Sequence, residues 1–415
     1  CHQLAKEVWG YVTVRKDAHM FWWLYYTTNS YKNFLELPLI MWLQVNTSFL
    51  ASTGDPHLSL LPLRLFTLQA ASLLFVDNPV GTGFSYVNTS DAYAKDLAVV
   101  ASDMMVFLKT FFDSHSEFQT VPFYIFSESY GGKMAAGISL ELYKAAKQGT
   151  IKCNFSGVAL GDSWISPVDS VLSWGPYLYS MSLLDDVGLA EVSAIAEKVL
   201  AAVNSGHYKE ATELWSEAES IVEKNADNVN FYNILTKSTP NLAMESSLEF
   251  IWPVISGRLS QRHVRRLHQG TLSQLMNGPI RKKLQIIPQD VSWGGQSSYV
   301  FTNMEEDFMK PVIIFVDALL EAGINVTVYN GQLDLVVDTM GQEAWLRKLK
   351  WPGLSQFSQQ RWKALYSDPK SSETSAFVKS YKNLCFFWIL GAGHMVPSDR
   401  GDMALKMMKL VTQQE

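Results

Sequence analysis

The stretch FYIFSESYGGKMAAGISLELYKAAKQG, residues 123–149, reads as an apolar strand, a crowded turn and an amphipathic helix. A strand that reverses into a helix within a few residues needs small side chains at the turn, and Ser127 and Gly131 supply them. Such a turn projects Ser129 outward, where its hydroxyl becomes a candidate nucleophile. The segment therefore predicts a strand, a sharp turn and a helix, with a reactive serine at the turn.

The same alternation of strands and helices continues along the chain. Short apolar runs that end in Gly, Asn or Asp alternate with helical patterns, which is typical of a mostly parallel sheet covered by helices. The predicted strands lie in 71–83, 121–126, 156–160, 324–331 and 383–390, and the predicted helices in 97–111, 134–145, 189–203, 211–221 and 310–323. Gly149 is placed to end the helix after the opening turn as a left-handed cap.

One long region interrupts this alternation. From about residue 176 to residue 270 the pattern is helical, with no strand signal between the helices. We interpret residues 176–270 as a helical cap insertion, and residues 1–175 and 271–415 as an α/β core.

Composition excludes several classes of protein. The 415 residues carry 34 Lys and Arg against 40 Asp and Glu, so the net charge of -6 offers no basic surface for nucleic acid. The three cysteines show no metal-ligand spacing, so we predict neither a zinc site nor a disulfide framework, and no cofactor. No apolar run is long enough to span a bilayer, so we expect a soluble protein without a membrane span.

A serine nucleophile needs a histidine base and a carboxylate that orients the histidine. Among eight histidines, His394 follows a strongly apolar strand and precedes a Met-Val-Pro turn. Asp334 follows the strand that ends at Gly331, and Asp338 is the second choice. Singly, these residues could be a turn serine, a helix-capping aspartate and a solvated histidine; together, in the order Ser, Asp, His, they favour a catalytic triad.

Four motifs resemble a known family. FSESYGGKM at 126–134, VDNPVGTGFSY at 76–86, YNGQLDLVVDTMGQEAW at 329–345 and GAGHMVPSDRGDMAL at 391–405 closely resemble the serine carboxypeptidases. The resemblance implies an α/β-hydrolase fold and a secreted or lysosomal hydrolase that removes residues from peptide or protein C-termini at acid pH. An esterase or acyltransferase on the same scaffold is a less favoured alternative.

The resemblance also implies roles for individual residues. Two carboxyl groups held together cannot both ionise cheaply, so Glu128 would stay protonated at acid pH and donate a hydrogen bond to the substrate's terminal carboxylate. Without the resemblance, Glu128 would read as a helix-start acid and Met395 as a core residue. The implied roles are nucleophile for Ser129, base and acid for His394, orienter for Asp334, oxyanion donor for the Tyr130 N–H, and substrate binding for Glu128, Gln44 and Met395.

Two segments depart from the family pattern. The family follows its WLQ strand with a Gly-Gly-Pro-Gly loop that supplies a second oxyanion donor, and residues 45–67 contain no such loop. Loss of one oxyanion donor costs about 3 to 4 kcal/mol of transition-state stabilisation. A catalytically impaired relative that acts as a binding protein is therefore the alternative function. The second departure lies at 250–263.

Four Asn-x-Ser/Thr sequons occur, at Asn46, Asn88, Asn154 and Asn325. We predict Asn88, Asn154 and Asn325 as glycan acceptors if the chain enters the secretory route. Asp77 and Asn78 follow a strand and are expected to form a turn.

Overall fold

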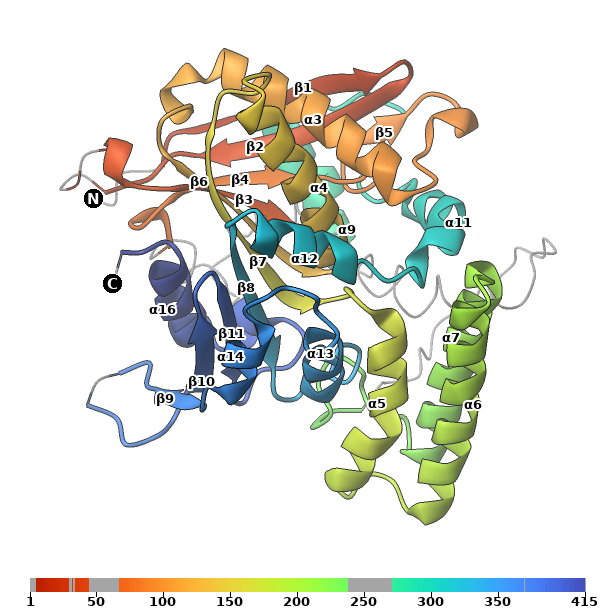
Figure 1. The fold of residues 1–415 in the computed structure, drawn as a ribbon. Helices are drawn as coiled ribbons and strands as arrows, with labels where there is room; N and C mark the ends of the chain where they lie inside the picture. Colours follow the sequence, from red (N-terminus) through yellow and green to blue (C-terminus); the bar gives the residue numbers. More distant parts are fainter. Residues whose placement is uncertain are drawn as a thin grey trace.

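A computed structural model of the chain describes residues 5–29, 32, 34–44, 67–237, 271–368 and 370–414. A twisted mixed sheet runs through the molecule with helices packed on both faces, and a group of helices extends away from one end of it (Figure 1).

The described residues contain an 11-stranded sheet in the order β1-β2-β4-β3-β6-β7-β8-β11-β10-β9, with β5 paired to β2. The neighbours from β4 to β11 in this order run parallel, whereas β1, β2, β9 and β10 pair antiparallel at the two ends. The strands are β1 Glu7–Arg15, β2 Ala18–Tyr25, β3 Leu39–Leu43, β4 Ser72–Val76, β5 Tyr86–Val87, β6 Pro122–Ser129, β7 Asn154–Ser163, β8 Asn325–Gly331, β9 Lys363–Leu365, β10 Ala376–Tyr381 and β11 Leu384–Ile389.

Helices connect and cover these strands. The α-helices are α3 Leu97–Ser114, α4 Tyr130–Lys147, α5 Pro167–Ser180, α6 Asp186–Asn204, α7 Tyr208–Asn225, α9 Thr271–Leu275, α10 Arg281–Leu284, α11 Ser297–Phe308, α12 Ile313–Glu321, α13 Thr339–Leu346, α14 Leu354–Gln359, α15 Val396–Asp399 and α16 Gly401–Val411. Short 3-10 turns cover Phe34–Glu36, Ser90–Ala92 and Ser116–Phe118, and a π turn covers Met276–Ile280.

The sheet is buried on both faces, and strand β2 shows how its sequence produces this. Side chains alternate between the two faces of a strand, so an uninterrupted apolar run supplies two cores. One face of β2 joins a hydrophobic cluster with α3, α4 and α12 through Met20, Trp22 and Leu24. The other face joins a cluster with α16 through Phe21, Trp23 and Tyr25. The loops at the carboxyl ends of the parallel strands are left to form a site.

The predicted elements are confirmed in kind, with shifted boundaries. The strands and helices predicted from periodicity all occur, and Gly149 has the left-handed φ of 72° expected of a helix cap. The helix predicted over 310–323 begins only at Ile313 as α12, because Pro311 disfavours helical backbone at the residue before it. Asp77 and Asn78 lie in the loop after β4, where the Asp77 carboxylate accepts the N–H of Phe84.

Helices α5, α6 and α7 share a hydrophobic cluster that includes Leu333 and Val337 from the loop after β8. Helix α5 begins at Pro167, before the predicted start of the insertion. The division into a core and a 176–270 cap stays a prediction, since residues 238–270 lie outside the described part of the chain.

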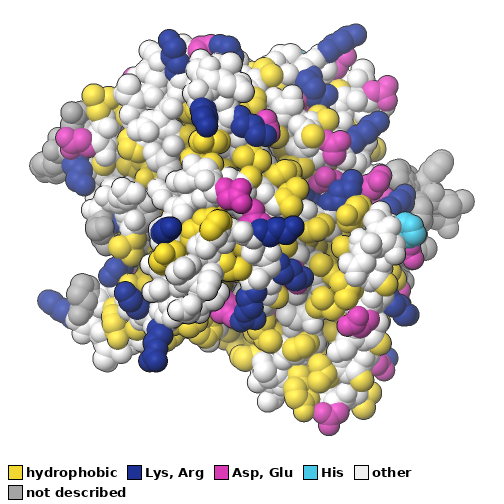
Figure 2. All heavy atoms as spheres, in the orientation of Figure 1, with side chains coloured by type: hydrophobic (Ala, Val, Ile, Leu, Met, Phe, Trp, Pro, Cys, Tyr) yellow, Lys and Arg dark blue, Asp and Glu magenta, His cyan; other side chains and the backbone are white. Residues whose placement is uncertain are grey.

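In the described part of the chain, no helix is both long and apolar enough to cross a membrane. On the face drawn in Figure 2, basic and acidic side chains are interspersed between apolar patches, in keeping with the small net charge.

Candidate active site

Ser129 occupies a strained turn between β6 and α4. Its φ of 61° and ψ of -132° lie in a region that residues other than glycine rarely adopt. The Trp164 N–H donates to the Ser129 carbonyl at 3.0 Å, which holds this backbone in place. Among the described residues, the Ser129 hydroxyl caps no N–H of α4. The structure therefore presents the hydroxyl at the turn, as the sequence predicts.

Two glycines allow the turn to close. A Cβ on Gly131 would lie 2.2 Å from the Leu43 carbonyl oxygen, and one on Gly132 would lie 1.9 Å from the Ser163 hydroxyl. Both distances are far below van der Waals contact, so only glycine lets α4 start this close to β3 and β7. Ser127 is also buried, and its hydroxyl donates to the Ala159 carbonyl at 3.0 Å. The small residues in this turn are thus required by packing.

His394 and Asp334 meet across the ends of two neighbouring strands. His394 lies in the loop after β11 and Asp334 in the loop after β8; His394 Nδ1 and Asp334 Oδ2 are 2.7 Å apart. Both side chains are buried, at 2% and 0% exposure. The Nδ1–H of His394 donates to the carboxylate, which leaves Nε2 as the ring acceptor.

Asp338, the second choice for the carboxylate, has a different task. It is the N-cap of α13: its Oδ1 accepts the Gly341 N–H at 3.0 Å, and its Oδ2 accepts the Ser173 hydroxyl at 2.7 Å. Burial raises the pKa of Asp338 to about 7. The geometry favours Asp334 over Asp338 as the partner of His394.

Gln44 links the two loops that carry Ser129 and His394. Its Nε2 donates to Glu128 Oε1 at 2.6 Å and lies 3.7 Å from the sulfur of Met395. The structure thus brings these three side chains together, and two of them are sequence neighbours of candidate catalytic residues: Glu128 directly precedes Ser129, and Met395 directly follows His394.

The surroundings of Glu128 favour its neutral form. Burial raises its pKa to about 8; His394 opposes this shift, and the carboxyls of Asp162, Asp334 and Asp399 add to it. Its Oε2 has no hydrogen-bond partner among the described residues. A neutral carboxyl with one free oxygen can donate a hydrogen bond to an anion placed beside it.

A buried ion pair that sequence reasoning missed anchors the first turn of α4. The ammonium of Lys133 lies 3.0 Å from Asp307 Oδ2, and the Tyr130 hydroxyl donates to the same oxygen at 2.9 Å. Burial lowers the pKa of Lys133 to about 8, against the opposing effect of Asp307. Because Asp307 belongs to α11, more than 170 residues away, no local pattern identified this pair. It fixes the backbone of Tyr130 at the positive end of the α4 dipole.

Asp162 is the second residue that the sequence did not reveal. It is the last residue but one of β7, has a left-handed φ of 41°, is fully buried, and accepts the Gly331 N–H at 2.8 Å. One carboxylate oxygen of Asp162, one of Asp334 and a ring nitrogen of His394 lie within 4.8 Å of one another. The signal that could have found it is a polar residue at the end of a central parallel strand.

The remaining predictions concern glycan acceptors and the two segments that depart from the family pattern. Asn88, Asn154 and Asn325 are exposed, whereas Asn46 lies outside the described residues. So do residues 45–66, which carry most of the first departure from the family pattern, and all of 250–263.

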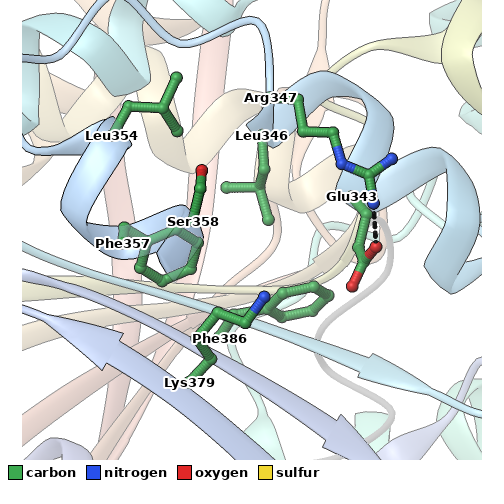
Figure 3. A pocket seen from close by; sticks show the side chains of 8 residues that line it. All are labelled: Glu343, Leu346, Arg347, Leu354, Phe357, Ser358, Lys379 and Phe386. Atoms are coloured by element: carbon green, nitrogen blue, oxygen red, sulfur yellow. Dashed lines mark hydrogen bonds and ion pairs between the residues drawn. The ribbon is translucent and has the colours of Figure 1, made fainter. Parts of the chain in front are cut away.

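A pocket away from Ser129 is lined in large part by apolar side chains. It lies between α13, α14 and the strands β10 and β11, and Leu346, Leu354, Phe357 and Phe386 surround it (Figure 3). An ion pair between Glu343 and Arg347 lies at its rim. None of its lining residues belongs to the Ser129 site.

Comparisons with known proteins show what the chain is similar to. A family model described as serine carboxypeptidase matches residues 68–414. The retinoid-inducible serine carboxypeptidase of Homo sapiens is 76% identical over 418 residues, covering 99% of this chain and 92% of that protein. Serine carboxypeptidase-like 51 of Arabidopsis thaliana is 42% identical, covering 98% and 92%.

Among solved structures, that of Kex1Δp, a prohormone-processing carboxypeptidase from Saccharomyces cerevisiae, superposes with a TM-score of 0.80 at 21% identity, covering 99% of this chain and 92% of that one. This likeness shows the fold, and it confirms the α/β-hydrolase arrangement expected from the sequence.

Proposed function

The chain belongs to the serine carboxypeptidase family, and from this premise we propose that it releases C-terminal amino acids from peptides and proteins through an acyl-enzyme formed on Ser129. The observation that carries the proposal is the group of Gln44, Glu128 and Met395 beside the His394–Asp334 hydrogen bond. It provides a place for a terminal carboxylate next to a candidate nucleophile.

The proposed reaction has two halves. The Ser129 hydroxyl attacks the carbonyl carbon of the last peptide bond while His394 Nε2 takes its proton, and Asp334 stabilises the imidazolium. The Tyr130 N–H, at the start of α4, donates to the developing oxyanion. His394 then gives the proton to the leaving amine. In the second half, water attacks the acyl carbon while His394 takes its proton. His394 then returns this proton to the Ser129 oxygen as the shortened peptide leaves.

Substrate recognition in this proposal depends on a protonated acid. The protonated carboxyl of Glu128 donates a hydrogen bond to the terminal carboxylate of the substrate. The Gln44 amide holds this carboxyl in place, with 2.6 Å between Gln44 Nε2 and Glu128 Oε1. An ionised Glu128 would repel the same carboxylate. Binding should therefore be strongest below the pKa of about 8 that burial produces.

The direct test is release of free amino acids from N-blocked dipeptides between pH 4 and pH 7. We expect one C-terminal amino acid per dipeptide and no release from dipeptides whose C-terminus is amidated. Folded protein that releases nothing at any of these pH values would contradict the proposal.

Glu128→Gln should change the pH dependence of KM. In the native protein, KM for a dipeptide should rise about tenfold per pH unit above pH 8, as Glu128 loses the proton that it donates. The amide of the variant donates at every pH, so its KM should stay flat over the same range. Michaelis curves from pH 5 to pH 10 measure this difference.

The matched control is Glu141→Gln, a carboxyl on the exposed face of α4 that pairs with Lys144. This variant should keep the native pH dependence. If Glu128→Gln also keeps it, Glu128 does not recognise the terminal carboxylate by the proposed hydrogen bond.

The alternative of a catalytically impaired binding protein gains no support from the comparisons. It depended on residues 45–67, and apart from Thr67 these lie outside the described residues. The carboxypeptidase assignment does not depend on them, since the family match begins at residue 68.

We also propose a secreted or lysosomal location, with glycans on Asn88, Asn154 and Asn325. Exposure of all three side chains supports the proposal, because an acceptor asparagine must reach the transferase. A loss of mass after glycosidase treatment of the natural protein would support it, and unmodified asparagine at all three sites would contradict it.

A further inference from the structure

Three buried ionisable side chains meet at the carboxyl end of the sheet, and the proposed reaction uses only two of them. Asp162 is the last residue but one of β7, while Asp334 and His394 lie in the loops after the next two strands, β8 and β11. The exposure of Asp162 is 0%, and so is that of Asp334. A carboxyl placed this deep needs a partner for each oxygen.

The hydrogen bonds around the two carboxyls are unequal. Asp334 accepts from His394 Nδ1 at 2.7 Å and from the Val337 N–H at 3.2 Å, one bond on each oxygen. Asp162 accepts the Gly331 N–H on Oδ1, but its Oδ2 has no N–H or O–H donor among the described residues. Two adjacent carboxylates would repel each other, whereas one proton on Asp162 would turn its unpaired oxygen into a donor toward Asp334.

We propose that Asp162 is a positioning residue, whose protonated carboxyl donates a hydrogen bond to Asp334 and holds that carboxylate in the orientation that His394 requires. The proposal rests on the role of His394 and Asp334 in the proposed function. Asp334 then carries the single negative charge of the pair, and its third hydrogen bond prevents rotation of the carboxylate away from the imidazole.

Electrostatics agree with this assignment of the proton. Burial raises the pKa of Asp162 well above its usual range, and the nearby charge of Asp334 raises it further, while His394 and the Gly331 N–H act in the opposite direction. Burial also raises the pKa of Asp334, but the hydrogen bonds from Asp162 and Val337 oppose that rise. The ionisable groups that face this pair are His394, Glu128 on β6, Tyr329 on β8, Tyr177 on α5 and Asp338 at the start of α13.

Asp162→Asn provides the conservative test. Asparagine tolerates the left-handed backbone at this position, its oxygen can still accept the Gly331 N–H, and its amide can donate to Asp334 at every pH. Asp162→Gly accepts the same backbone but removes the donor. The measurement is the rate at which a fluorophosphonate labels Ser129 from pH 5 to pH 10. This probe has no terminal carboxylate, so the titration of Glu128 as a substrate ligand does not enter.

At pH 5 we expect the labelling rate of Asp162→Asn to lie within about threefold of the native rate. At high pH the native rate should fall as Asp162 ionises, whereas the rate of the variant should not fall. We expect Asp162→Gly to label about 10 to 100 times more slowly at every pH, because a misplaced base costs this much. KM for dipeptides should change little in both variants, whereas kcat should follow labelling.

A proton NMR spectrum keeps the test independent of activity. The Nδ1 proton of His394 should give a downfield signal in the native protein and in Asp162→Asn, and the signal should be lost or shifted in Asp162→Gly. If the native protein is never labelled, the nucleophile of the proposed function fails, and the NMR signal still tests Asp162.

Three results would overturn the proposal. The first is an Asp162→Asn profile identical to the native one; if Asp162→Gly does not fold, this comparison decides alone. The second is a folded Asp162→Gly variant in which Ser129 is labelled at the native rate. The third is labelling that a chelator abolishes and zinc restores, since the three side chains would then bind a metal instead of a shared proton.

Discussion

Ser129→Ala is expected to lower kcat for dipeptide hydrolysis by about 10⁵ to 10⁶-fold, because no other group replaces the nucleophile in the proposed acyl-enzyme route. KM should change little, since the proposed contacts of Glu128 and Gln44 to the terminal carboxylate remain. Stability should change little as well, because the hydroxyl caps no N–H of α4 among the described residues. Fluorophosphonate labelling followed by peptide mass mapping measures the effect directly.

Ser127→Ala is the matched control, because Ser127 is also a serine and lies on β6 only two residues before Ser129. Its hydroxyl is buried and donates to the Ala159 carbonyl, so its loss should cost about 1 kcal/mol of unfolding free energy and leave labelling in place. Labelling that persists in Ser129→Ala, or that disappears only in Ser127→Ala, would show that the nucleophile has been misassigned.

Asp334→Asn is expected to lower kcat by about 10⁴-fold, because an amide favours the wrong tautomer of the imidazole. In the native protein the carboxylate accepts the Nδ1–H of His394, which frees Nε2 to take a proton. An amide NH₂ group facing Nδ1 would instead favour the proton on Nε2. The loss should appear in kcat and in the labelling rate, with KM for dipeptides nearly unchanged.

Asp338→Asn provides the comparison, because both aspartates are fully buried and follow the same strand. Asparagine is also a good N-cap: its oxygen can still accept the Gly341 N–H, and its amide NH₂ can donate to the Ser173 oxygen. Activity should therefore stay within about threefold of native, and stability should fall by less than about 1 kcal/mol. A larger loss of kcat in Asp338→Asn than in Asp334→Asn would reverse the assignment of the orienting carboxylate.

Local sequence patterns were sufficient to predict individual strands and helices. The apolar runs of β4, β6, β7, β8 and β11 were predicted as strands, and the periodic stripes of α3, α4, α6 and α7 as helices, because each pattern follows directly from burial of one or two faces. The boundary of α12 was less accurate, since a single proline shifted its start. Residue order then favoured Ser129, Asp334 and His394 as a triad, and the resemblance to a family supplied the expected binding roles of Glu128, Gln44 and Met395.

Local patterns ranked Asp334 ahead of Asp338 but could not show the contact that distinguishes the two carboxyls. Asp334 and Asp338 follow the same strand in similar sequence, and only the position of His394, 60 residues away, separates the base's partner from the helix cap. Asp162 and the pair of Lys133 with Asp307 were missed for the same reason, because their partners lie on other strands and helices.

The sequence by itself determined the elements of this protein, the sharp turn at Ser129 and the family to which the chain belongs, since these depend on side-chain size, periodicity and residue order. Only the tertiary structure decided which acids are buried together and which neighbouring charges act on their pKa values. Coulomb interaction and desolvation depend on distance and depth in three dimensions, and the order of residues along the chain specifies neither.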